Sequence, residues 1–155
     1  MFALAIALAY LESLIPSFGV PGIKLGLSNT IVMYCLFFIG PIPALIIAVL
    51  KAVFVFFTRG VIAGILSASG GICSVGMMIL LSRLKASKGA VSVAGAVTHN
   101  AAQLIASWVI MSSTVVFYYM PVLMLSGVVM GMITAVVLKL VFPALARINT
   151  QNTKQ

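Results

Sequence analysis

PALIIAVLKAVFVFFT, residues 43–58, is the stretch that decides the fold, because Lys51 is its only charged residue. Similar apolar runs recur along the 155 residues, of which 63% are hydrophobic and 6% are charged. A soluble domain has roughly 25% charged residues. The chain therefore has too little polar surface for a soluble fold. Long apolar runs cross a bilayer as helices, so we expect an all-α integral membrane protein.

The composition also excludes most enzyme chemistry. Glu12 is the single acid and there is no aspartate, against nine Lys and Arg. Paired-carboxylate catalysis and a carboxylate cage for Mg²⁺ or Ca²⁺ are therefore impossible within this chain. One His and two Cys, Cys35 and Cys73, cannot complete a four-ligand zinc site, and no phosphate-binding GxxxxGK[ST] loop is present. We expect no enzyme, no cofactor and no metal, and the scattered cations form no face for nucleic acid.

Six apolar segments predict one domain of six transmembrane helices over residues 1–146. A polar cytoplasmic tail over 147–155 follows, which we expect to be frayed. We expect the fourth helix to be interrupted at Ser67–Gly71, where small residues are concentrated, and an aromatic corner at Tyr118–Pro121 to precede the sixth. The predicted helices cover residues 1–15, 25–39, 43–58, 61–82, 90–113 and 122–145.

The first predicted helix is short for a full span. It either continues upstream of Met1 or tilts little. A cleaved signal peptide is disfavoured, because there is no basic n-region and Glu12 lies where a cleavage site requires small neutral residues.

The cations divide unequally between the two predicted membrane sides. The loop 83–89 and the tail 147–155 hold most of them, and Lys139 can reach the same side. The opposite side keeps only Lys24 and Arg59. The positive-inside rule then predicts a multi-pass protein of the cell membrane with both termini in the cytoplasm.

Polar side chains interrupt the fifth predicted helix at membrane depth, where each requires a reason. His99, Gln103 and Ser107 follow an i, i+4, i+8 spacing and form one stripe, and Asn100 lies about 100° round the helix from His99. Interhelical hydrogen bonding is one interpretation. A ligand site is the other, because three strong hydrogen-bonding groups within five residues exceed what packing requires.

The outer half of the bundle is predicted to keep a net positive charge. Lys51 and Arg59 share a face of the third helix, and Lys51 falls near the bilayer midplane. Lys24 lies toward the outer side, and Glu12 can neutralise only one of these cations. A cavity there favours a polar or anionic ligand, which cations would attract, amides would orient and His99 would make pH-sensitive. The candidate substrate-binding residues are Lys24, Asn29, Lys51, Arg59, His99, Asn100 and Gln103.

Small residues four apart let helix backbones approach closely. Gly127 and Gly131 mark the sixth helix in this way, and alternate alanines mark the first. These patterns indicate either packing within the bundle or docking of the first helix to another membrane subunit. The candidate docking residues are Ala3, Ala5, Ala7 and Ala9.

ESLIP at 12–16, PGIKLGLSN at 21–29 and THNAAQ at 98–103 resemble the Gx transporter family, and the resemblance covers nearly the whole chain. Members of that family are often labelled heptaprenyl diphosphate synthase component I, and they are similar to the substrate-binding S components of energy-coupling factor (ECF) transporters. The resemblance implies a six-helix S-component fold with an outward-open cavity closed by the loop after helix one. It also implies that the helix-one alanines dock onto a transmembrane coupling subunit joined to two ATPases.

The leading hypothesis is therefore a non-enzymatic, S-component-like subunit that binds a small metabolite. The alternative is a non-catalytic membrane accessory subunit of heptaprenyl diphosphate or isoprenoid-quinone synthesis. Trans-prenyl diphosphate synthases resemble one another in aspartate-rich motifs that hold magnesium on diphosphate, and this chain has no aspartate. A third hypothesis is a structural bundle whose polar residues only hold helices together.

Overall fold

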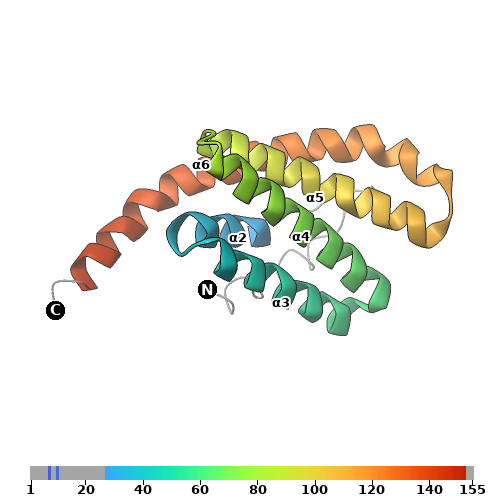
Figure 1. Cartoon of the computed structure of the whole chain (residues 1–155), viewed down its shortest axis with the longest axis horizontal. Coiled ribbons are helices and arrows are strands. Elements are labelled where there is room, and N and C mark those ends of the chain that lie inside the picture. The colour runs from blue at the N-terminus through green and yellow to red at the C-terminus, as the bar shows by residue number, and fades with distance from the viewer. Residues whose placement is uncertain (1–6, 8–9, 11–26, 153–155) are drawn as a thin grey trace.

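The computed structural model describes Ala7, Tyr10 and residues 27–152, with side chains for Ala7, Tyr10 and 29–139. Over this part of the chain the protein forms five α-helices and one short 3-10 helix, and no strand (Figure 1). The elements are α2 (Leu27–Phe38), α3 (Pro41–Arg59), α4 (Val61–Arg83), α5 (Lys88–Met111), η1 (Thr114–Tyr119) and α6 (Met120–Asn152).

The all-α prediction is confirmed for these residues, and the last five predicted helices match α2 to α6 closely at their starts. Ala7 and Tyr10 are helical. The rest of the first predicted helix lies outside the described residues, so a bundle of six helices stays a prediction.

Two details of the predicted fold are wrong. The fourth helix is not interrupted, since α4 runs without a break from Val61 to Arg83. Ser67, Gly70 and Gly71 are buried in the bundle, and a Cβ at Gly71 would lie 3.6 Å from Cβ of Ala48 on α3. The last helix also continues through the expected frayed tail as far as Asn152, while residues 153–155 lie outside the described part.

The helix boundaries follow from local backbone preferences. Gly40 and Gly60 adopt positive φ angles of 133° and 89° at the two junctions that flank α3, a region that favours glycine. Pro41 starts α3, where its missing N–H does no harm. Ser87 caps α5 by accepting a hydrogen bond from the Ala90 N–H at 3.2 Å.

Helix α5 lies at the centre of the packing, between α4 and α6, while α4 lies between α3 and α5 (Figure 1). Two serine hydroxyls join these helices: Ser74 Oγ donates to the Gly95 carbonyl at 2.8 Å, and Ser92 Oγ donates to the Gly131 carbonyl at 2.7 Å. Glycine at these crossings brings the backbones close enough for such bonds. The buried apolar core is completed by α2, whose Met33 is 1% exposed.

The outer surface is that of a membrane protein. Three helical segments in the described chain are long and apolar enough to cross a bilayer: Pro41–Arg59, Val61–Arg83 and Thr114–Lys139. Large apolar side chains such as Phe57 and Ile42 are exposed, as expected for a surface that faces lipid. Helix α5 is not among the three, and polar residues break its apolar run at 98–103.

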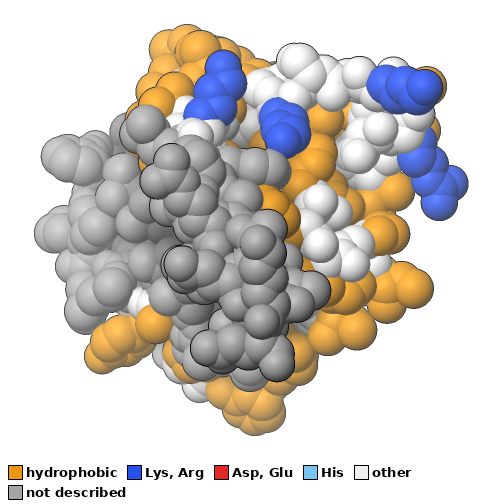
Figure 2. Space-filling model, turned by 90° about the vertical axis from the view of Figure 1, so that its left-hand side faces the viewer, with side chains coloured by type: hydrophobic (Ala, Val, Ile, Leu, Met, Phe, Trp, Pro, Cys, Tyr) orange, Lys and Arg blue, Asp and Glu red, His pale blue; other side chains and the backbone are white. Residues whose placement is uncertain are grey.

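One end of the bundle carries most of the described cations. Arg83, Lys85 and Lys88 are exposed around the α4–α5 loop, and Lys139 is exposed at the same end. Figure 2 looks at that end and shows Lys and Arg side chains gathered on it. Arg59 lies at the opposite end, where α3 turns into α4. This separation agrees with the positive-inside argument, and the orientation itself stays a prediction.

The α5–α6 crossing gives a stability test. In Gly131→Ala the new Cβ would lie 2.6 Å from the Val93 backbone Cα, so the helices must move apart. We expect the thermal midpoint in detergent to fall by about 3–10 °C. Gly76→Ala is the control, because nothing lies within 4 Å of a Cβ there. Equal thermal midpoints for the two variants would contradict the close approach of α5 and α6 at Gly131.

Candidate functional site

The polar stripe of α5 meets α4 at a glycine. A Cβ at Gly70 would lie 2.8 Å from Cγ of Gln103 and 2.8 Å from Cε1 of His99, so both side chains lie directly over this position. The Nδ1 atom of His99 is buried at the contact. The geometry therefore places His99 and Gln103 side by side, as their spacing indicates.

A cavity of about 460 Å³ continues from this stripe toward η1. Gln103 and Ser107 line it from α5, and Tyr119 lines it from η1. Most of the remaining wall is apolar. The described lining residues are Ala63, Leu66, Gln103, Leu104, Ser107, Met111, Ser113, Val115, Val116, Tyr119 and Leu123.

This cavity lies at the end of the bundle away from the α4–α5 loop. It takes its walls from the start of α4, the end of α5, η1 and the start of α6. The cationic loop joins the other ends of α4 and α5. If the cations face the cytoplasm, the cavity lies toward the outside.

The cavity provides uncharged hydrogen-bonding groups in an apolar wall. The Gln103 amide both donates and accepts, and the Ser107, Ser113 and Tyr119 hydroxyls do the same. None of its described lining residues is charged. Sites of roughly 300–1,000 Å³ with a few such groups are typical of small-molecule binding. The geometry therefore suits a small ligand that is bound by shape and a few hydrogen bonds.

Asn100 faces a different helix. Its Nδ2 donates to the Leu123 carbonyl of α6 at 2.7 Å and lies 3.4 Å from Ser126 Oγ. Ser126 Oγ donates to the same carbonyl at 2.9 Å. Asn100 thus joins α5 to α6 by an interhelical hydrogen bond, which is one of the two roles considered for it from the sequence. It is not among the residues that line the cavity.

The other predicted binding residues that the structure describes lie on α2 and α3. Lys51 is half-buried and falls on the buried stripe of α3, one turn from both Ile47 and Val55. Arg59 is exposed at the end of α3, and Asn29 is half-buried in the first turn of α2. None of these three lines the cavity beside Gln103.

Several predicted residues lie outside the described part of the chain. They include Lys24 of the binding set, Glu12, and three of the docking alanines, Ala3, Ala5 and Ala9. Ala7, the fourth alanine, is helical and exposed. The docking surface and the charge balance of the outer half therefore stay predictions.

Comparison with known proteins identifies the family. The family described as heptaprenyl diphosphate synthase component I matches residues 1–141, which is nearly the whole chain. The chain belongs to the heptaprenyl diphosphate synthase component I family. No curated protein and no solved structure matches it. The family likeness expected from the sequence is thereby confirmed.

The family description names a component of a synthase, whereas the sequence of this member holds no aspartate. Among residues 7, 10 and 27–152, no group of three or more His, Cys, Asp or Glu side chains could hold a metal ion.

Sequence reasoning missed much of the cavity wall. Ser113 and Tyr119 approach it because Ser112, the residue that follows α5, adopts a left-handed conformation with φ 49° and η1 packs beside α5. The aromatic corner at 118–121 was the available signal, although it indicated an interface and not a binding wall. Leu66 and Ala63 carried no signal, since apolar wall residues look like any other part of a spanning helix.

Asn100→Leu tests the assignment of Asn100 to helix packing. Removing the bond to the Leu123 carbonyl should lower the thermal midpoint in detergent by about 2–4 °C, because such interhelical bonds contribute about 1 kcal/mol. Ser107→Ala is the control on the same helix and should leave the midpoint unchanged. An unchanged midpoint in Asn100→Leu would return Asn100 to the list of ligand-binding candidates.

Proposed function

We propose that this family member is the membrane-embedded, substrate-binding subunit of a small-molecule transporter, resembling an S component of the ECF type. The observation that carries the proposal is the cavity of about 460 Å³ beside the polar stripe of α5. It combines Gln103 and Ser107 with apolar walls, and it lies at the end of the bundle away from the cationic loop. An outward-facing receptor requires a site in this position.

The ligand follows from the lining. Gln103, Ser107 and Tyr119 offer both donors and acceptors, so a small polar metabolite with an apolar portion fits this wall. His99 lies one turn from Gln103 on the same face of α5, where its ring packs over Gly70 beside the cavity. An anionic ligand would require cations as well, and Lys24, Lys51 and Arg59 remain the proposed source of positive charge.

The energy for transport would come from partners. The sequence contains no phosphate-binding loop. A transmembrane coupling subunit with two ATPases would supply the driving step and would dock on the helix-one alanines. Ala7 is helical and exposed, which suits such a contact.

A second function is favoured by the family description. A non-catalytic accessory subunit of heptaprenyl diphosphate or isoprenoid-quinone synthesis would hold a soluble synthase at the membrane. Its working surface would be the cationic end, with Arg83 and Lys85. Purification with native partners separates the two functions. Coupling and ATPase subunits support the transporter, and a prenyl diphosphate synthase supports the accessory role.

Filling the cavity tests ligand binding. Leu66→Trp places an indole in the cavity, so we expect the amount of small molecule that co-purifies with the protein to fall tenfold or more, as ~1.4 kcal/mol of steric conflict would produce. The measurement is mass spectrometry of the molecules released when the purified protein is denatured.

Ile65→Trp is the matched control, because Ile65 is the neighbouring residue on α4 and is 47% exposed on the outer surface. It adds the same indole outside the cavity and should retain the wild-type amount of ligand. Equal retention by both variants, or no released molecule from the wild type, would contradict a ligand site in this cavity.

A further inference from the structure

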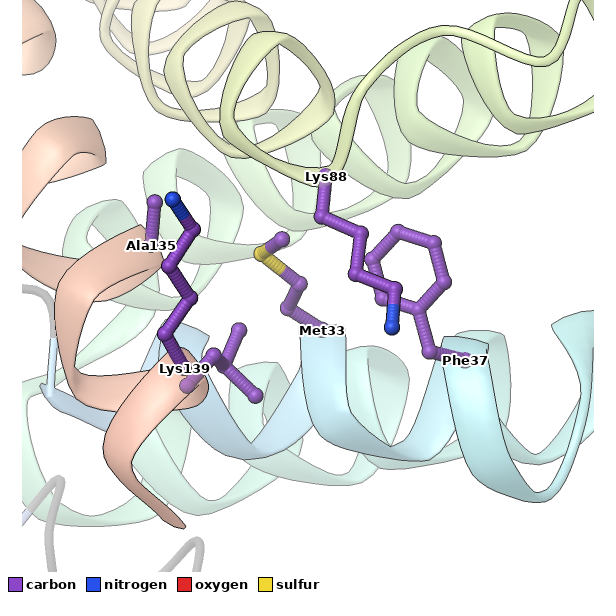
Figure 3. A pocket seen from close by; sticks show the side chains of 6 residues that line it. Met33, Phe37, Lys88, Ala135 and Lys139 are labelled. Carbon is purple, nitrogen blue, oxygen red and sulfur yellow. The ribbon is translucent and has the colours of Figure 1, made fainter. Parts of the chain in front are cut away.

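A second, smaller pocket lies at the cationic end of the bundle. It has a volume of about 150 Å³ and takes its walls from α2, α5 and α6. Figure 3 shows the side chains of Lys88 and Lys139 extending from α5 and α6 on either side of Met33. The described lining residues are Met33, Phe37, Lys88, Ala135, Leu138 and Lys139, and none of them is acidic.

The pocket combines charge at its edge with an apolar floor. Met33 and Leu138 are 1% and 3% exposed, whereas Lys88 and Lys139 are exposed. The ammonium group of Lys88 lies 5.8 Å from the centroid of the Phe37 ring, an arrangement that orients the cation beside an apolar surface. Such a site suits a ligand with an anionic head and an aliphatic portion.

The position of the pocket along the membrane normal indicates the source of this ligand. Helix α5 begins at Lys88, next to the exposed Arg83 and Lys85 of the α4–α5 loop where the chain leaves the hydrocarbon, and Lys139 lines the same pocket from α6. Both lysines therefore lie where hydrocarbon gives way to headgroups. Lys88 is also the first residue of α5, and the positive end of a helix dipole attracts anions.

We infer that this pocket binds the phosphate group of an anionic membrane lipid, with Lys88 and Lys139 holding the phosphate and the lipid chains lying against α2 and α6. The volume accommodates a headgroup phosphate and little more, so the chains remain on the lipid-facing surface. Basic pockets between spanning helices on the cytoplasmic side typically bind such headgroups. The inference concerns the opposite end of the bundle from the cavity beside Gln103 and does not depend on transport.

The test compares two variants of equal charge in the full-length protein. Lys88→Gln/Lys139→Gln removes both pocket cations, and Arg83→Gln/Lys85→Gln removes two cations from the same end outside the pocket. Delipidated protein in detergent is titrated with phosphatidylglycerol, phosphatidylcholine or inorganic pyrophosphate, and bound species are counted by native mass spectrometry. Thermal midpoints show whether each variant is folded. If the pocket double variant does not fold, Lys88→Gln and Lys139→Gln are measured singly.

We expect phosphatidylglycerol to bind the wild type more tightly than phosphatidylcholine does. The pocket variant should bind phosphatidylglycerol about 25-fold more weakly, because each lysine beside an anionic headgroup contributes roughly a factor of five. The control variant should retain most of the binding. Equal loss in both variants would show a general surface charge effect and overturn the inference. Displacement of the lipid by pyrophosphate would overturn the lipid source in favour of a soluble phosphate.

Discussion

The close approach of α5 to its two neighbours is the constraint on which the site depends. Glycines replace side chains at these crossings: Gly70 on α4 faces His99 and Gln103, and Gly131 on α6 faces the backbone of Val93. Because neither position leaves room for a Cβ, the rotation of α5 is fixed. That rotation directs its polar stripe toward α4 and the cavity, and turns Asn100 toward α6.

The sequence predicted the described helices well, because apolar runs separated by Gly and Pro leave few alternatives in a membrane. It also predicted the stripe of His99, Gln103 and Ser107 from helical spacing. It failed at 67–71, where glycine serves helix packing in an unbroken α4. It could not assign Asn100 between packing and binding, since that choice depends on which neighbouring helix faces each side of α5, and a sequence does not contain that information.

The two ends of the bundle differ in the chemistry they offer. At one end, a cavity large enough for a metabolite has a mostly apolar wall with a few uncharged amide and hydroxyl groups. At the other, Lys88 and Lys139 flank a small pocket with an apolar floor. In an outward-facing receptor, the metabolite cavity would lie at the outer end of the bundle and the lysine-flanked lipid pocket at the cytoplasmic end. The family description names a synthase component, and it is compatible with a membrane subunit of this kind of helical fold.

The most direct test of this account is the accessibility of Ser107 from outside the cell. In a variant with Cys35 and Cys73 replaced by alanine, Ser107→Cys should react with a small, membrane-impermeant thiol reagent added to intact cells. Ile105→Cys lies on the lipid-facing side of the same helix and should not react. The opposite result, with Ser107→Cys reacting only after the cytoplasmic side is opened, would contradict an outward-facing binding cavity.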